Sequence, residues 1–303
     1  SAASDVYKRQ VWEWWSGTQD IVHSSTSQSG GTWTQVETVS DTSSDLPQVV
    51  ADSSGRVTVI WANRADQGSL IQSRTKIPGD GWQSIVNLSD SGGIAADAKL
   101  AVNSSGLVAA IWTRWDNADT EVVQVKTLEL PGAWSPTFAF FQEHPGCNSD
   151  GIGDCVGTPD VIVDSAGLIT AIWSRWNAGS NIVQSSFVES GSEWSTPFDL
   201  SDGGGWDQKL AVDSSGLVTA VWNYYDEIMD QDVLQASNIS HDTSSSPPPS
   251  SGGSNSDTST VKPLIKAAPM QKPKVKGAAK VSAVLFVAKQ TWSGFPTPKV
   301  TYR

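Results

Sequence analysis

One mixed polar and apolar phrase recurs along the chain, and each copy ends in a tryptophan nine residues after an Asp or Asn. The four copies read ADSSGRVTVIW (51–61), VNSSGLVAAIW (102–112), VDSAGLITAIW (163–173) and VDSSGLVTAVW (212–222). After each Gly the apolar residues occupy both even and odd positions, which is typical of a strand buried on both faces. The turn predicts a hairpin, because Asp or Asn accepts backbone N–H bonds and Gly supplies a positive φ. We therefore interpret four residues as turn formers rather than ligands: Asp52, Asn103, Asp164 and Asp213.

The tryptophans that end these phrases, together with Trp12, are anchors spaced 49, 51, 61 and 49 residues apart. After each anchor comes a β-like segment, at 21–25, 70–74, 122–126, 182–186 and 233–237. A second tryptophan follows in four units: Trp33, Trp82, Trp134 and Trp194. Each unit thus predicts four short strands, and four-stranded sheets stacked radially bury their inner strands. The sequence predicts an all-β propeller over residues 11–240 with five blades, the first starting at its second strand and the last stopping after its third. We expect the anchors to be wedges between blades.

The segment before each second tryptophan resembles the Asp-box of sialidase-type propellers, Ser/Thr-x-Asp-x-Gly-x-x-Trp. The segments are TSQSGGTW (26–33), TKIPGDGW (75–82), TLELPGAW (127–134) and FVESGSEW (187–194). Gln28 stands in the acidic place of the first, and Pro131 replaces the Gly of the third. The resemblance implies the propeller fold, with the box between the third and fourth strands of a blade. Because the boxes are degenerate, it does not imply the activity.

Both ends of the chain differ from the repeats. Residues 1–10, SAASDVYKRQ, resemble a translated transposase-type sequencing adapter over all ten codons, so we set them aside and expect the natural start to be missing. Residues 241–260 are a Ser/Pro/Gly linker, which reads TSSSPPPSSGGSNSDTST over 243–260. In 261–303, the stretch KVKGAAKVSAVLFVAKQTWSGFPTPKVTYR (274–303) resembles the opening of bacterial Ig-like repeats, which implies a truncated Ig-like domain.

Charge and hydropathy exclude some classes of partner. From Lys262 onward there are nine Lys and Arg and no acidic residue, so the remainder holds 11 basic against 32 acidic residues. An acidic body repels phosphate backbones, which argues against nucleic acid. The chain contains no run of about 18 apolar residues, so the sequence predicts no membrane-spanning helix.

Aromatic residues followed by Asp or Asn recur after the second strand of the predicted blades. In an antiparallel blade, the connections after the second and fourth strands share one edge. Aromatic rings stack on sugars while carboxylates and amides bind hydroxyls, which predicts a glycan-binding surface. The candidate residues are Trp115, Asp116, Asn117, Trp176, Asn177, Tyr225 and Asp226. The alternative is that Trp115 and Trp176 cover the seams between blades.

Arg64, Arg114 and Arg175 lie two or three residues beyond consecutive anchors. The sialidase resemblance implies three arginines on a substrate carboxylate, whereas the simpler interpretation pairs each with local acids or a neighbouring Trp. Glycoside hydrolysis needs two placed carboxylates, and the sequence indicates no such pair and hence no catalytic residue. We therefore expect a non-catalytic module of a secreted or cell-surface bacterial protein that binds a glycan or a surface protein. The alternatives are a sialidase-like glycoside hydrolase and a structural or adhesion spacer.

The long third spacing contains the insertion CNSDGIGDC (147–155). Cys147 and Cys155 predict a local disulfide. Between them, NSDGIGD resembles the calcium loop of thrombospondin type 3 repeats, which implies Ca²⁺ ligands from Asn148, Asp150, Ile152 and Asp154. Gly146 stands where that pattern has its first Asp, so a plain Gly/Asp turn stays as the alternative. No other cofactor is indicated.

Overall fold

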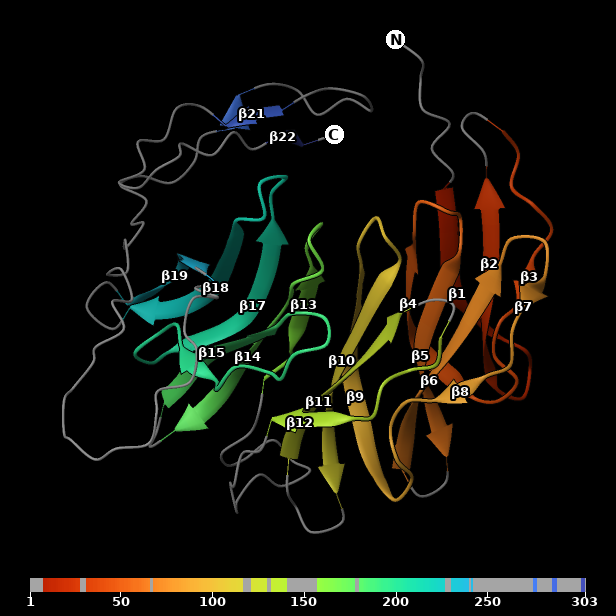
Figure 1. The fold of residues 1–303 in the computed structure, drawn as a ribbon, viewed down its shortest axis with the longest axis horizontal. Helices are drawn as coiled ribbons and strands as arrows, with labels where there is room; N and C mark the ends of the chain where they lie inside the picture. The colour runs from red at the N-terminus through yellow and green to blue at the C-terminus, as the bar shows by residue number, and fades with distance from the viewer. Residues whose placement is uncertain are drawn as a thin grey trace.

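The computed structural model describes residues 8–241, apart from 28–30, 66–67, 117–120, 130–131, 141–156, 178–179, 227–229 and 240, and three short strands beyond them. All elements of this described part are β-strands, and it contains no helix (Figure 1). The predicted all-β class is therefore confirmed.

The strands form five consecutive antiparallel sheets, which we name first to fifth. The first has β1 (Lys8–Trp15), β2 (Asp20–Ser27) and β3 (Glu37–Thr38). The second has β4 (Ser44–Ala51), β5 (Val57–Ala65), β6 (Gly68–Ile77), β7 (Gly81–Trp82) and β8 (Val86–Asn87). The third has β9 (Gly93–Val102), β10 (Leu107–Asp116), β11 (Glu121–Glu129) and β12 (Phe138–Phe140). The fourth has β13 (Asp160–Val163), β14 (Ile169–Asn177), β15 (Ser180–Val188) and β16 (Phe198–Asp199). The fifth has β17 (Gly205–Val212), β18 (Val218–Asp226) and β19 (Gln231–Ile239).

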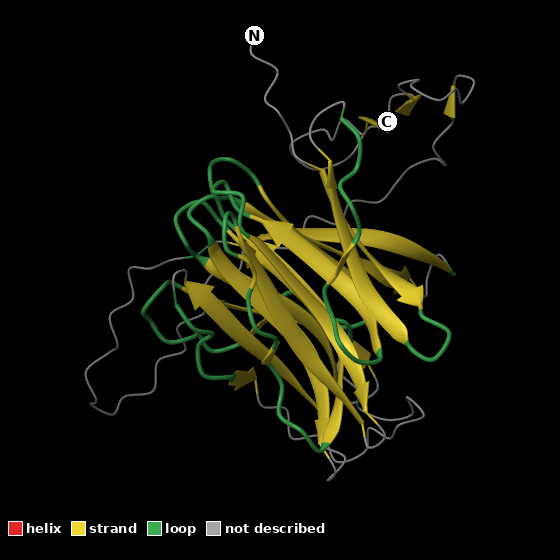
Figure 2. Ribbon diagram, turned by 90° about the vertical axis from the view of Figure 1, so that its right-hand side faces the viewer, coloured by secondary structure: helices red, strands yellow, loops and turns green. Residues whose placement is uncertain are grey.

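The sheets stand side by side in sequence order, from red to blue-green in Figure 1. Figure 2 shows that neighbouring sheets pack face to face. The second and third sheets are joined by a single parallel pair, Ser69 with Ile94. The fourth strands β3, β8, β12 and β16 are only two or three residues long. This succession of short meanders packed by their faces is the β-propeller architecture that the repeats predicted.

The anchor tryptophans lie between successive sheets, as predicted. Trp61, Trp112, Trp173 and Trp222 are 0% exposed and belong to the apolar clusters that separate neighbouring sheets. Trp12 departs from the prediction: it is only half-buried, because no sheet precedes the first one in the described part.

A cross-strand glutamine holds the indole of three anchors. Trp61 Nε1 donates to Gln72 Oε1 at 3.1 Å, and Trp112 Nε1 donates to Gln124 Oε1 at 2.9 Å. Trp222 Nε1 donates in the same way to Gln235 Oε1, on the third strand of its sheet, at 3.0 Å. A buried N–H without a partner is costly, so the Gln stabilises these three anchors. The fourth sheet differs, because the Trp173 indole N–H is buried without a partner although Gln184 is its cross-strand neighbour.

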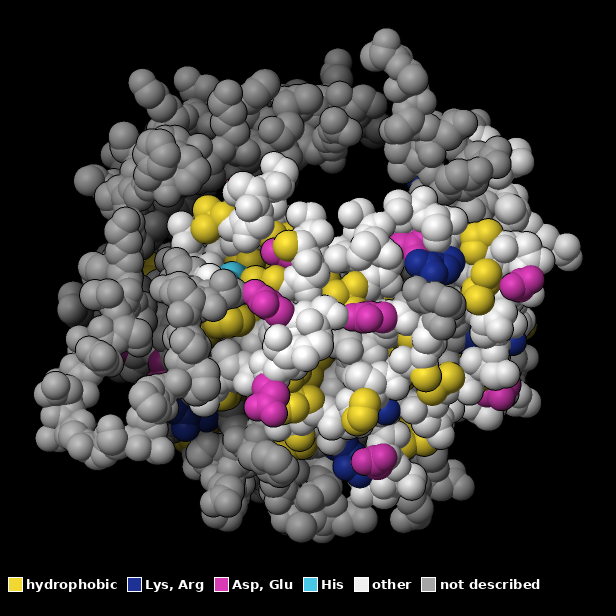
Figure 3. Space-filling view, in the orientation of Figure 1, with side chains coloured by type: hydrophobic (Ala, Val, Ile, Leu, Met, Phe, Trp, Pro, Cys, Tyr) yellow, Lys and Arg dark blue, Asp and Glu magenta, His cyan; other side chains and the backbone are white. Residues whose placement is uncertain are grey.

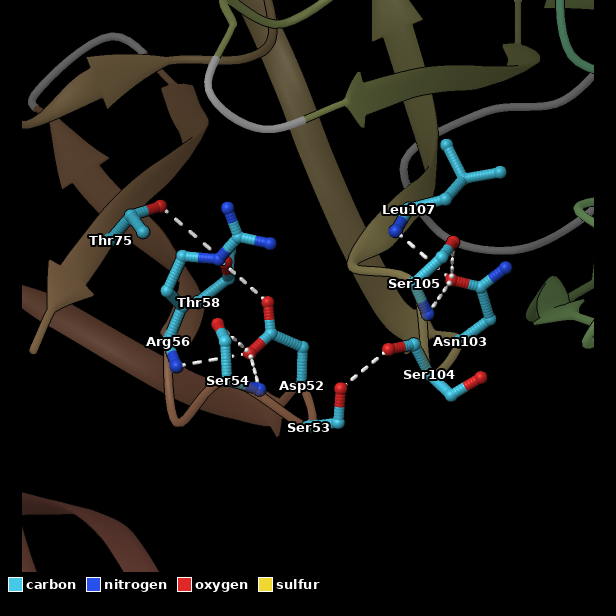
Figure 4. A network of polar contacts seen from close by, with 10 residues as sticks. All are labelled: Asp52, Ser53, Ser54, Arg56, Thr58, Thr75, Asn103, Ser104, Ser105 and Leu107. Carbon is cyan, nitrogen blue, oxygen red and sulfur yellow. Dashed lines mark hydrogen bonds and ion pairs between the residues drawn. The ribbon is translucent and has the colours of Figure 1, made fainter.

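The Asp/Asn turns form as predicted and also connect neighbouring sheets. Asn103 Oδ1 accepts from the Ser105 backbone N–H at 3.1 Å and from the Leu107 N–H at 3.0 Å. Asp52 makes the equivalent bonds one sheet earlier, and Ser53 Oγ donates across to the carbonyl of the Asn103 turn at 2.7 Å (Figure 4). These turns therefore stack along one edge of the molecule, which we call the turn edge.

The carboxylates of two of these turns, those of Asp52 and Asp213, have lowered pKa values. Burial alone would raise the pKa of Asp52, but hydrogen bonds from Ser54 and Arg56 and the Arg56 charge outweigh it, so the pKa lies below its usual range. Arg56 Nε lies 2.7 Å from Asp52 Oδ2. The side-chain hydroxyl and backbone N–H of Ser215 likewise lower the pKa of Asp213. These two residues are thus engaged in hydrogen bonds within their own turns, as predicted.

The described segments near the ends bear on two of the predicted boundaries. Lys8, Arg9 and Gln10 are the first residues of β1 and pair with β2. This pairing does not test whether they derive from a sequencing adapter. Residues 1–7 lie outside the described part. His241, placed in the linker, lies 3.0 Å from Thr170 Oγ1 and packs edge-on against the Phe187 ring.

Most of the linker and of 261–303 is outside the description. The three short strands there are β20 (Val275–Lys276), β21 (Leu285–Val287) and β22 (Thr301–Tyr302), which pair antiparallel. The Ig-like resemblance stays a prediction.

Candidate functional site

The edge opposite the turn edge, which we call the loop edge, brings two kinds of connection together. It carries the ends of the second strands and the segments that lead into the first strands. Ser69 Oγ donates to the Ala95 carbonyl at 2.6 Å, and Gly204 N–H donates to Ser180 Oγ at 2.8 Å. The prediction that both sets of connections share one edge is therefore confirmed wherever they are described.

Aromatic side chains occupy one repeat position on this edge, three residues after the anchor. Trp15 and Tyr225 expose 60% and 42% of their surface, while Trp115 and Trp176 are half-buried. The indole N–H of Trp115 is buried without a hydrogen-bond partner. The Tyr225 hydroxyl donates to Asp230. Four of the five sheets thus present an aromatic ring here, and Arg64 takes the place in the second sheet.

The structure separates the three arginines. Arg64 is largely exposed and forms an ion pair with the buried carboxylate of Asp45. Arg114 and Arg175 lie one position closer to their anchors, and side chains of a strand alternate between its faces, so they point to the other side from Arg64. Arg114 Nη2 donates to a backbone carbonyl at 3.2 Å, and Arg175 lies 4.0 Å from Asp199. Arg64 and Arg175 thus lie beside local acids, as in the simpler interpretation, whereas the partner of Arg114 is a backbone carbonyl and neither an acid nor a Trp.

A cleft of about 410 Å³ lies between β1, β4 and β9. It is lined by Val11, Trp12, Glu13, Leu46, Pro47, Gln48, Asp97, Ala98 and Lys99. Glu13 Oε1 accepts the Leu46 backbone N–H at 2.6 Å, which ties the first sheet to the second. Two carboxylates and an ammonium group therefore meet an indole in one hollow, a chemistry that suits a polar ligand with an apolar face.

Irregular backbone places two of these lining residues. β4 and β9 each carry a β-bulge in this region, and Leu46 and Asp97 adopt φ values of 49° and 54°. Asp207 has φ 51° in the matching bulge of β17. A positive φ is unfavourable for these residues, and bulges of this kind re-aim side chains next to binding sites. Positive φ at three equivalent repeat positions indicates that this strained backbone geometry is a regular feature of the repeat.

Reasoning from sequence missed this cleft, because its residues come from three strands far apart along the chain. A signal was present: Asp-x-Lys precedes Leu-Ala-Val in both DAKLAV (97–102) and DQKLAV (207–212). No repeat signal marked Glu13, because an acidic residue directly follows the anchor Trp only in the first unit.

Several predicted site residues lie where their side chains are not described. Asp226 itself is buried and interacts with other groups of the protein. Asp116 and Asn177 end β10 and β14, and nothing is described of their side chains. The remaining predicted residues lie outside the described ones: Asn117, Asn148, Asp150, Ile152, Asp154, Cys147 and Cys155. The calcium and disulfide predictions therefore stay predictions.

The described residues contain no cluster of three His, Cys, Asp or Glu arranged for a metal ion. Among the same residues there is no helix that could cross a bilayer. Acidic and basic side chains are interspersed on the face seen in Figure 3, without a continuous basic stripe there.

Comparisons with known proteins support the fold. No protein-family model matches the chain, and no curated protein sequence does. An ulvan lyase of polysaccharide lyase family PL25 superposes with a TM-score of 0.51 at 10% identity, covering 78% of this chain and 64% of the lyase. An endo-arabinase from Bacteroides thetaiotaomicron (TM-score 0.43, 16% identity) covers 76% and 93%, and the Hadza microbial sialidase Hz136 (0.44, 11%) covers 72% and 52%.

These neighbours are named as a lyase, an endo-arabinase and a sialidase. The likeness extends to the fold alone, and of the three only the lyase has a TM-score above 0.5. The chain is thus an all-β protein of propeller architecture, and its function has to be argued from its own residues.

Proposed function

We propose that the chain is a non-catalytic, glycan-binding propeller module of a secreted or cell-surface bacterial protein. The observation that carries the proposal is the row of aromatic rings at one repeat position of the loop edge. An exposed indole such as Trp15 offers a flat apolar face to a sugar ring, and neighbouring polar groups bind its hydroxyls.

The cleft adds polar groups to this row. Glu13 and Trp15 belong to the same strand, so the cleft and the exposed ring are neighbours. Gln48, Asp97 and Lys99 provide donors and acceptors in the same hollow. A sugar chain bound across the edge would stack on the rings and direct hydroxyls toward these groups. Asp116, Asn117 and Asn177 are the predicted further contributors.

The experiment measures retention of the whole chain on immobilised arabinan, ulvan and sialylated glycoprotein. Trp15→Ala is expected to weaken binding about tenfold, which corresponds to ~1.4 kcal/mol. Trp33→Ala is the matched control: Trp33 is 43% exposed but lies past the far end of β2, away from the loop edge. Equal effects of the two changes would contradict the proposal. No retention on any glycan would favour the spacer or adhesion alternative.

A second candidate function, glycoside hydrolysis, is favoured by the two carboxylates that line one cleft. Retaining and inverting glycosidases both use two such groups. Turnover of aryl glycosides that is lost in both Glu13→Gln and Asp97→Asn would establish this alternative. Turnover lost on replacing Arg64, Arg114 or Arg175 would point the same way. Glycan binding without turnover is the result that the non-catalytic proposal requires.

A further inference from the structure

The outer face of the fifth sheet exposes apolar residues at positions that are buried in every other complete repeat. Val221 and Leu234 are 38% and 55% exposed. Val221 directly precedes its anchor Trp, and Leu234 directly precedes the cross-strand Gln. Their counterparts are all 0% exposed: Ile60, Ile111 and Ile172, and Ile71, Val123 and Val183. The fifth sheet therefore carries the surface of an interior interface on its outside.

The protein shows what normally covers this surface. Ile60 and Ile71 pack in one cluster with the Trp112 face of the third sheet. The same arrangement recurs where the third sheet meets the Trp173 face of the fourth. It recurs again where the fourth sheet meets the Trp222 face of the fifth. Each aliphatic face is thus covered by the tryptophan face of the sheet that follows it.

The first sheet has the complementary open surface. Trp12 is half-buried, and Trp14, two residues further on the same face, is 50% exposed. The His23 ring stacks on Trp14 at 5.1 Å and meets Trp12 edge-on at 6.0 Å. This is a tryptophan face without an aliphatic face against it in the described part. The first and fifth sheets stand at opposite ends of the row in Figure 1.

We propose that a second copy of this chain docks head to tail, with the Trp12–Trp14 face of one copy on the Val221–Leu234 face of the other. The surfaces match because each of the three internal contacts places an anchor Trp, at the repeat position of Trp12, against aliphatic residues at the repeat positions of Val221 and Leu234. Trp14 enlarges the apolar area of this face in the first sheet. A face-to-face sheet contact buries aromatic and aliphatic groups that are otherwise in water, which is the signature of an interaction surface. The contact is heterologous, so each copy keeps one open face after docking.

Sedimentation velocity of the 303-residue chain at increasing concentration tests the proposal. The mean mass is expected to rise above the 32.2 kDa of one chain. Leu234→Asp and Trp14→Asp are each expected to abolish the rise. Val86→Asp is the matched control, since Val86 is 43% exposed in β8 on neither end face. A wild-type chain that stays at the mass of one copy at every concentration would overturn the proposal.

Mixing Leu234→Asp with Trp14→Asp, the two variants expected not to associate alone, distinguishes head-to-tail docking from other modes of association. The Leu234→Asp copy keeps its tryptophan face, and the Trp14→Asp copy keeps its aliphatic face, so an equimolar mixture should form a one-to-one pair and grow no further. If Trp14→Asp alone still associates, two aliphatic faces are pairing with each other and the proposal is wrong. Near-UV circular dichroism shows whether each variant is folded; Val221→Lys replaces Leu234→Asp if that variant is not.

Discussion

Replacing Asn103 with alanine tests whether the stacked turns hold neighbouring sheets together. Asn103 Oδ1 accepts bonds from the Ser105 N–H at 3.1 Å, the Ser105 hydroxyl at 2.7 Å and the Leu107 N–H at 3.0 Å. Its Nδ2 donates to the Asp164 carbonyl at 3.0 Å, in the turn of the next sheet. One buried amide therefore joins two sheets.

The expected loss follows from these four bonds. A net hydrogen bond contributes about 0.5–1.5 kcal/mol, and a buried group left unpaired costs ~1–3 kcal/mol. Asn103→Ala leaves the Leu107 N–H and the Asp164 carbonyl without this partner, so we expect it to lower the free energy of unfolding by about 2–4 kcal/mol. Asn103→Asp keeps the acceptor but loses the donor to Asp164, and we expect it to cost about 1–2 kcal/mol.

Urea unfolding followed by tryptophan fluorescence measures these losses. Asp213→Ala is the control, because Asp213 makes the same bonds to Ser215 and Leu217 in an exposed turn. Water can replace the lost acceptor in that exposed turn, so Asp213→Ala is expected to cost less than Asn103→Ala. The reasoning is refuted if Asn103→Ala costs no more than Asp213→Ala, since the bond between sheets would then contribute nothing.

Three further predictions concern single contacts. Gly68→Ala should be strongly destabilising by thermal unfolding, because Gly68 has φ 135° and an added Cβ would collide with the backbone carbonyl of Gly93. Gln124→Leu should lower the free energy of unfolding by ~1–3 kcal/mol, since it leaves the Trp112 N–H buried without an acceptor. Acidification should remove the stability that Asp52 provides: its pKa is lowered on folding, so the contribution is complete above the unfolded value of about 3.9 and disappears as pH falls through the folded value.

Each of the three has a reference measurement. Gly79→Ala shares the positive φ but meets no atom within 4 Å, so it should cost less than Gly68→Ala. Gln10→Leu changes an exposed glutamine and should be nearly neutral. The stability difference between the wild type and Asp52→Asn should shrink below about pH 4; a difference independent of pH would contradict the assignment.

Part of the candidate site could be read from the chain. The repeat placed Trp115, Trp176 and Tyr225 at equivalent strand ends, and antiparallel pairing then required one shared edge for them. The exposure of each ring could not be read in the same way. Tyr225 is exposed because no sheet covers the fifth one in the described part, whereas Trp115 and Trp176 have neighbours on both sides.

The strands, the turns and the wedges between sheets follow from the chain alone, because they depend on local chemistry that recurs in each repeat. An Asp or Asn four or five residues before the strand, a Gly at positive φ and a two-sided apolar strand suffice for one hairpin. Three features depend instead on how distant strands pack: the cleft at Glu13 and Asp97, the separation of Arg64 from Arg114, and the open face at Leu234. The first depends on bulges that re-aim distant strands, the second on which face of a strand a side chain takes, and the third on which neighbour is present.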